Sequence, residues 1–320
     1  MSFRISHSTA AGIPLVQLHD DSLSTTVSII PHAGAMLHGF STVMDGQVVN
    51  VIDHYPDATN LDRELSLSYK SSKLSPFPCR IEKGRYSFEG KAYQFDRLFP
   101  DGSAIHGLLF DRPFEVTRQD VTSFMATAVF QYDYPADDAG YPFPYRCVIS
   151  YALFPGNKLQ LQTTISNTGS QKIPIGDGWH PYFQLGGQVD QWTLKFPADG
   201  MLEFNDQLLP TGRMLEADDF RSGIVIGDRQ LDNCFLLDAN SPGPVCTLGR
   251  PETGWSIDFF TDGQYPFLQL YIPPHRQSIA IENLSMAPNG FHNQMGVTIL
   301  DPGESKTLTV FYQLNTGETA

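Results

Sequence analysis

Basic residues are scarce in this sequence of 320 residues. It has 21 lysines and arginines against 35 aspartates and glutamates, which gives a formal net charge of −14 at pH 7. Proteins bind nucleic acids and anionic membranes through clustered lysine and arginine side chains. The deficit of positive charge disfavours both partners, and we expect neither nucleic acid nor a membrane to be bound.

Cysteine is also rare, with only Cys79, Cys147, Cys234 and Cys246 in the chain. None of them forms a C-x-x-C pair, and no cysteine–histidine spacing is typical of a zinc site. Cys147 and Cys234 have apolar neighbours, which favours small buried thiols, and a chain of this size does not need disulfides for stability. These features favour a reduced, cytoplasmic protein.

Long apolar runs and helical periodicity are missing as well. No stretch reaches the roughly 20 apolar residues of a membrane helix. Residues 1–15 lack the charged-then-apolar pattern of a signal peptide. Helical turns are expected only at residues 61–70 and within residues 135–139.

Short strand patterns make up most of the chain. Residues 86–95 alternate aromatic and polar residues around Glu89-Gly90, which is typical of a β-hairpin. Turn residues at 155–157 and 301–304 separate further strands. We expect strands at residues 23–30, 47–52, 114–116, 124–132, 145–154, 158–166, 192–196, 234–238, 255–261, 267–272, 279–282 and 306–314. This pattern predicts one all-β domain over residues 1–320, a large antiparallel β-sandwich.

Two segments carry candidate catalytic side chains. In residues 279–283, Glu282 lies in an otherwise apolar strand, and burying a carboxylate is costly unless it is paired or used. In residues 178–183, His180 lies among aromatic side chains, although a buried core cluster would have the same pattern. A histidine and a glutamate held across a cavity are the minimum parts for acid/base catalysis.

Four further residues are candidate ligands for a sugar. His106 precedes Gly107, which lets a ligand or backbone approach closely, but it is equally compatible with a structural histidine. Arg80 follows a rigid proline-containing segment, and Asp232 enters a strand; an ion pair and a turn cap are their alternatives. Trp179 would offer an aromatic face to a pyranose ring.

Five motifs in this order resemble the aldose 1-epimerase (galactose mutarotase) superfamily, and the resemblance spans roughly residues 13–314. The motifs are residues 77–93, 105–107, 180–183, 231–235 and 281–283. Cys79 and Trp179 stand where the family often has asparagine, which alters the wall of the pocket.

The resemblance implies a galactose mutarotase-like supersandwich that interconverts the α and β anomers of a hexose without a cofactor. Glu282 would be the general base and His180 the general acid, while His106 would bind near the ring oxygen. Arg80 and Asp232 would hold hydroxyl groups. This mechanism needs an ionised Glu282 and a protonated His180, and it predicts a bell-shaped pH profile.

Several alternatives remain open at this point. A hexose 6-phosphate 1-epimerase would need cationic groups near the cleft, and a non-catalytic carbohydrate-binding protein would keep the cleft alone. A metal site of His106, His180, His275 or His292 with Glu282 is disfavoured because the chain has no His-x-His pair. A glycosidase would need paired carboxylates. The sugar remains open, as does the choice between monomer and homodimer.

Overall fold

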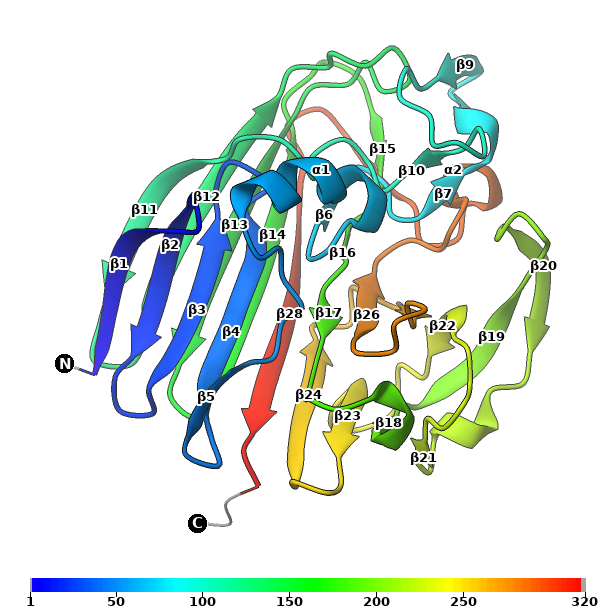
Figure 1. The fold of residues 1–320 in the computed structure, drawn as a ribbon. Coiled ribbons are helices and arrows are strands. Elements are labelled where there is room, and N and C mark those ends of the chain that lie inside the picture. The colour runs from blue at the N-terminus through cyan, green and yellow to red at the C-terminus, as the bar shows by residue number, and fades with distance from the viewer. Residues whose placement is uncertain (1, 318–320) are drawn as a thin grey trace.

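The first five strands form an antiparallel sheet of their own in the computed structural model, which describes residues 2–317 apart from the side chain of Asp218. Figure 1 shows this sheet in blue, in front of the strands β11 to β14. Its strands, in spatial order, are β1 (Phe3–Ala10), β2 (Ile13–Asp20), β3 (Thr25–Ile30), β4 (Met36–Met44) and β5 (Gln47–Asn50).

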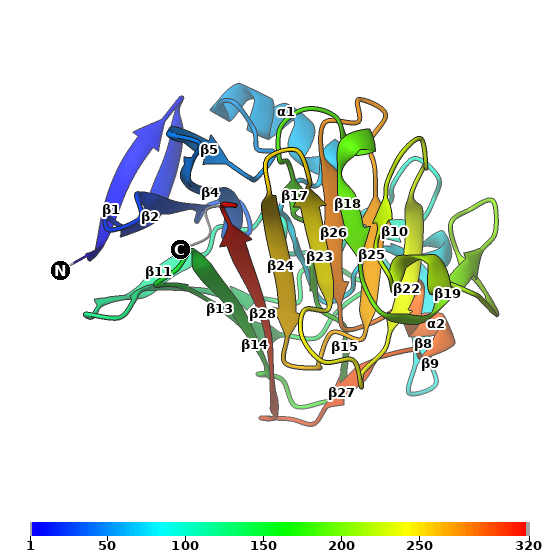
Figure 2. The same ribbon diagram turned by 90° about the horizontal axis from the view of Figure 1, so that it is seen from below.

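A nine-stranded antiparallel sheet runs through the middle of the molecule. Figure 2 shows that one part of it faces the first sheet and that the part containing β24 and β23 faces the third sheet. Its strands, in spatial order, are β11 (Glu115–Val121), β12 (Ala126–Tyr134), β13 (Tyr145–Phe154), β14 (Lys158–Asn167), β28 (Ser305–Asn315), β24 (Trp255–Thr261), β23 (Cys246–Arg250), β18 (Thr193–Lys195) and β21 (Ile224–Val225).

The third sheet has eight strands and carries three of the six candidate site residues, Trp179, Asp232 and Glu282. Seven of its strands lie in the order β20 (Pro210–Leu215), β19 (Ala198–Phe204), β22 (Asp232–Leu237), β25 (Phe267–Tyr271), β26 (Ile279–Leu284), β16 (Gly178–Trp179) and β6 (Lys73–Leu74). The eighth, β17 (Tyr182–Phe183), also pairs with β26.

Short elements connect and cover the large sheets. The two α-helices are α1 (Ala58–Ser68) and α2 (Gly290–Asn293), and the short 3₁₀ turns are η1 (Glu82–Gly84), η2 (Val189–Gln191) and η3 (Asp218–Phe220). Three small antiparallel pairs join β7 (Arg80–Ile81) to β10 (Ala104–Ile105), β8 (Arg85–Phe88) to β9 (Lys91–Gln94), and β15 (Ile173–Ile175) to β27 (Thr298–Leu300).

Alternation of side chains builds the core between the sheets. Along β14, buried and partly exposed residues alternate, as expected for a strand with one covered face. The ring of Phe183 contacts Phe259 and Tyr312 of the nine-stranded sheet, with centroids 4.9 and 5.3 Å apart. Apolar burial of this kind contributes about 25 cal/mol per Å² and stabilises the stacked sheets.

The structure confirms the predicted all-β antiparallel fold, including the hairpin of β8 and β9 and the turn between β13 and β14. The predicted helix at residues 61–70 is α1, which begins earlier because the Asp57 carboxylate accepts a hydrogen bond from the Asn60 amide at 2.7 Å. The helical turn predicted within residues 135–139 is wrong, since these residues form a loop. Among the longer strands, β1, β2, β4, β19, β20 and β23 were not predicted.

Candidate active site

Three adjacent strands present polar side chains on one face of the eight-stranded sheet. Gln269 of β25 lies opposite Glu282 of β26 on one side and Cys234 of β22 on the other. Asp232 pairs with Tyr271 two positions further along, so it shares this face. The Gln269 amide donates a hydrogen bond of 2.9 Å to the Asp232 carboxylate.

His180 follows β16 and lies against Glu282. Its Nε2 atom is 3.4 Å from the Glu282 Oε1 atom, and the two residues are only 5% and 1% exposed. The His180 amide donates to the Ser72 carbonyl at 3.1 Å, and the His180 carbonyl accepts from the Ser71 amide at 2.8 Å. These backbone bonds fix the imidazole next to the carboxylate.

His106 brings a second imidazole to the same place. Its ring meets the His180 ring edge-on, with centroids 4.9 Å apart, and lies 4.7 Å from the Tyr69 ring. The chain turns sharply here, with φ of +59° at His106 and +75° at Gly107. A Cβ atom at Gly107 would lie 2.2 Å from the Ser75 carbonyl oxygen, so the turn requires glycine.

These side chains surround a cavity of about 510 Å³. Arg80 and Asp232 also line it, and so do the aromatic rings of Tyr69, Tyr182 and Tyr271. Polar groups that converge among aromatic rings are typical of a small-molecule site. The structure thus brings together five of the six predicted site residues.

The cavity wall contains one arginine, Arg80, and one lysine, Lys70, and each already has a carboxylate partner. Arg80 Nε lies 3.0 Å from Asp101 Oδ2, and Lys70 Nζ lies 2.6 Å from Asp53 Oδ1. Their positive charges are therefore largely compensated before any ligand binds.

Burial shifts the pKa values of the central residues. It raises the pKa of Glu282 well above its usual value, and the charge of Asp232 adds to this effect. Burial lowers the pKa of His180 to about 4. It lowers that of His106 well below its usual value, and His180 and Arg80 act in the same direction.

The directions of these shifts run against the expected protonation states. An ionised Glu282 with a protonated His180 was expected, but desolvation favours a protonated Glu282 and a neutral His180. At a pH between the two pKa values the pair still holds one proton in total. It therefore contains one acid and one base, with their expected roles exchanged.

Metal ligands are also present in this cluster. Ligand atoms of His106, His180 and Glu282 lie within 4.8 Å of one another, and all three residues are buried. His275 lines the cavity outside this cluster. His292 lies elsewhere, with its Nε2 atom 2.6 Å from the Arg85 carbonyl oxygen. The structure thus assembles three of the five residues of the metal alternative.

The family model described as aldose 1-epimerase matches residues 14–313. This chain belongs to the aldose 1-epimerase family. It is 28% identical over 265 residues to the uncharacterized protein YihR of Escherichia coli strain K12, with 81% of each chain covered. It is 24% identical over 247 residues to the uncharacterized protein YphB of the same strain, which covers 73% of this chain and 80% of YphB.

Solved structures share the fold of this aldose 1-epimerase family member. A galactose mutarotase-like protein from Clostridium acetobutylicum has a TM-score of 0.85 at 17% identity and covers 98% of this chain and 99% of its own. A galactose 1-epimerase from Lactobacillus acidophilus NCFM has a TM-score of 0.82 at 20% identity and covers 99% and 100%. These likenesses establish the galactose mutarotase-like fold. Within residues 2–317, no helix is long and apolar enough to span a membrane.

Trp179 does not occupy the position expected from the sequence. It is 1% exposed, it does not line the cavity, and its indole packs under the Lys73 ammonium at 4.3 Å. Neighbouring residues in extended backbone point to opposite faces. Because His180 points into the cavity, Trp179 points into the core, and its expected role as a ligand for the sugar is not supported by this geometry.

Several residues of the cavity wall were not predicted from the sequence. Gln269 carried a usable signal, because it is a polar residue within an apolar strand, as Glu282 is. Tyr182 stood out as an aromatic residue near His180, whereas Tyr271 and Tyr69 carried no such signal, since tyrosines are frequent in this chain.

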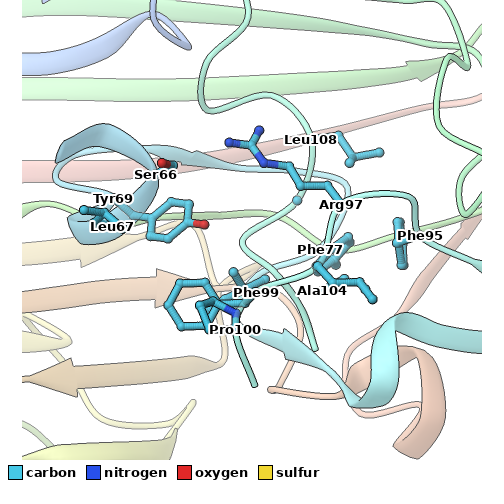
Figure 3. Close-up of a pocket in the computed structure, with 13 residues that line it drawn as sticks. Ser66, Leu67, Tyr69, Phe77, Phe95, Arg97, Phe99, Pro100, Ala104 and Leu108 are labelled. Carbon is cyan, nitrogen blue, oxygen red and sulfur yellow. The ribbon is translucent and has the colours of Figure 1, made fainter. Parts of the chain in front are cut away.

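A second, smaller cavity of about 220 Å³ adjoins the first. Figure 3 shows Tyr69 on one side of it, with the Arg97 side chain extending along it. Four residues line both cavities and form the wall between them: Leu67, Tyr69, Phe99 and Ile105. Arg97 is paired with Asp111 at 2.7 Å.

Proposed function

We propose that this chain is an aldose 1-epimerase that interconverts the α and β anomers of a hexose, with Glu282 and His180 as the acid/base pair. One observation carries the proposal: the Nε2 atom of His180 lies 3.4 Å from the Glu282 carboxylate inside a cavity of about 510 Å³. Membership of the aldose 1-epimerase family supports the reaction class.

The reaction requires one proton to be taken and one to be given. One member of the pair accepts the proton of the anomeric hydroxyl while the other protonates the ring oxygen, and the ring opens to the aldehyde. Rotation about the C1–C2 bond followed by reversal of both transfers gives the other anomer. A pair that holds one proton can start this cycle from either side, and each well-placed group contributes about 10² to 10⁴ in rate.

The remaining wall residues would bind the sugar. Arg80 and the Gln269–Asp232 pair supply hydrogen-bond donors and acceptors for hydroxyl groups, and His106 lies beside His180 near the expected ring oxygen. Tyr182 and Tyr271 offer aromatic faces. Because Arg80 and Lys70 already have carboxylate partners, a neutral hexose is favoured over a hexose 6-phosphate.

Polarimetry tests this proposal. Freshly dissolved α-D-glucose and α-D-galactose should reach the same final rotation faster with the protein than without it. Glu282→Gln should lower the catalysed rate by about 10² or more while sugar binding survives. Glu64→Gln is the matched control, because Glu64 is a carboxylate at the rim of the same cavity.

Other outcomes would contradict the proposal in distinct ways. Sugar binding without any acceleration would indicate a carbohydrate-binding protein. Acceleration with glucose 6-phosphate alone would indicate the phosphorylated substrate class. Full activity of the Glu282→Gln variant would exclude Glu282 from the acid/base pair.

A further inference from the structure

A completely buried ion pair lies behind the candidate active site. The Lys73 Nζ atom is 2.6 Å from the Asp177 Oδ2 atom, and the two side chains are 0% and 1% exposed. Neither residue lines the cavity. The pair therefore cannot touch a sugar, and its role must be sought in what it holds in place.

The ammonium group of Lys73 reaches two sheets at once. It donates to the Thr163 hydroxyl in β14 at 3.1 Å and to the Gly178 carbonyl in β16 at 3.2 Å, and it lies 4.3 Å above the Trp179 ring. Asp177 also accepts a hydrogen bond of 2.7 Å from Tyr265. These contacts join the nine-stranded sheet to the strand that leads into His180.

The connection to His180 is short. Lys73 pairs with Trp179 in the register of β6 and β16. The carbonyl oxygen of Ser72, the residue before Lys73, accepts a hydrogen bond of 3.1 Å from the His180 amide. A displacement of Lys73 would therefore move the backbone that orients the His180 imidazole.

The connection to Glu282 is equally direct. The Asp177 amide donates to the Ser285 hydroxyl at 2.8 Å, and the Ser285 amide donates to the Asp177 carbonyl at 2.8 Å. Gly178 pairs with Leu284, the last residue of β26, which carries Glu282. Asp177 thus ties the strand of His180 to the strand of Glu282.

Stability alone does not account for this arrangement. Burying two charges is costly, and well-packed apolar residues of similar volume often serve stability as well or better. Burial still raises the pKa of Asp177 despite its partner, and its Oδ1 atom has no hydrogen-bond partner among the residues described. The alternative explanation for the buried ion pair is that it fixes the relative position of the segments that carry His180 and Glu282.

We propose that Lys73 and Asp177 are positioning residues that hold His180 in register with Glu282 for proton transfer. This inference rests on the proposed epimerase function. Catalytic groups need placement to within about 0.5 Å, and a shift of about 1 Å can cost about 100-fold in rate. Arg80 and Asp232 come from other strands, so sugar binding should depend little on the ion pair.

The main test is the double variant Lys73→Met/Asp177→Asn, which removes both charges and nearly keeps the volume. We expect kcat to fall about 10- to 100-fold while KM changes less than about threefold. Thr25→Val is the control: it removes a buried hydroxyl that bonds Thr42 at 3.1 Å in the first sheet, and kcat should not change. A folded double variant with unchanged kcat, or with a change in KM alone, would overturn the proposal.

Two further measurements keep the inference testable if the double variant does not fold or if the wild-type protein shows no epimerase activity. Tyr265→Phe removes one hydrogen bond to Asp177 and leaves the ion pair, and it should lower kcat about two- to fivefold. A crystal structure of Tyr265→Phe or of the double variant should show the His180–Glu282 separation changed from 3.4 Å. An unchanged separation would overturn the positioning role independently of catalysis.

Discussion

The His180 Nε2 atom lies 3.4 Å from the Glu282 Oε1 atom, and burial moves the pKa values of the two groups in opposite directions. Each shift favours the uncharged form of its group. At a pH between these two pKa values the pair holds one proton, which is the condition that an acid/base pair needs.

The pH dependence of kcat/KM should reflect this shared proton. Below about pH 4, His180 becomes protonated and no base remains, so activity falls. On the alkaline side, activity falls when Glu282 loses its proton, at a pH well above the usual range of a glutamate. Polarimetric rates from pH 3 to 9, corrected for the uncatalysed reaction, measure both limbs. An acid limb centred near pH 6.5 would contradict the lowered pKa of His180.

The Asp232→Asn variant should shift only one of these limbs. The charge of Asp232 raises the pKa of Glu282, so its removal should lower that pKa and move the alkaline limb to lower pH. The acid limb should stay in place, because burial is the main cause of the lowered pKa of His180 and the charge of Asp232 is not among its causes. An alkaline limb that moves to higher pH would show that the Asp232 charge does not act on Glu282.

The Trp179→Phe variant should affect stability and leave KM within about twofold of the wild-type value. The indole is buried against Lys73 and Tyr151 and does not line the cavity, so we expect a loss of about 1–3 kcal/mol in the free energy of unfolding. Urea unfolding and sugar kinetics measure the two quantities. Tyr271→Leu, which alters the cavity wall, should raise KM instead. A large rise in KM for Trp179→Phe would restore its predicted role in the site.

Zinc should inhibit the proposed epimerase activity in competition with the sugar. Ligand atoms of His106, His180 and Glu282 lie within 4.8 Å of one another, and small movements would bring them to the spacing of about 3.3 Å set by Zn–N and Zn–O bonds. Inhibition constants measured at several sugar concentrations test this, with His106→Asn expected to weaken inhibition about tenfold or more. A chelator that abolishes the activity of the untreated protein would instead indicate a required metal.

His38, in β4 of the first sheet, should make the free energy of unfolding depend on pH. Burial lowers its folded-state pKa from 6.5 to about 4, and the neighbouring His54 acts in the same direction. Between these values the unfolded chain binds more protons than the folded chain, so stability falls as the pH falls through this window. From pH 7 to pH 5, we expect His38 to account for a loss of about 2 kcal/mol.

Urea unfolding of the wild type and of His38→Asn at the two pH values measures this contribution. The variant should lose less stability on acidification than the wild type, because other buried histidines contribute equally to both proteins. Equal losses in the two proteins would show that His38 keeps an ordinary pKa.

Many of the strands and the candidate pair of His180 and Glu282 could be predicted from the sequence, because the patterns that indicate them lie within short stretches of the chain. Alternation of aromatic and polar residues around Glu89-Gly90 predicted a hairpin that the structure confirms. The same local logic singled out Glu282, since a carboxylate in an apolar strand has to be paired or used. The resemblance to the aldose 1-epimerase family followed from the order of such local motifs.

Only the tertiary structure decided which face each side chain occupies and which charges remain compensated. Trp179 and His180 are neighbours in the chain, but extended backbone turns one into the core and the other into the cavity. The registers of β22, β25 and β26 place Gln269 beside Glu282. Desolvation, which depends on everything packed around a group, shifts the pKa values of His180 and Glu282 in the directions that oppose their expected protonation. Burial and register are properties of distant segments brought together, so no single stretch of sequence specifies them.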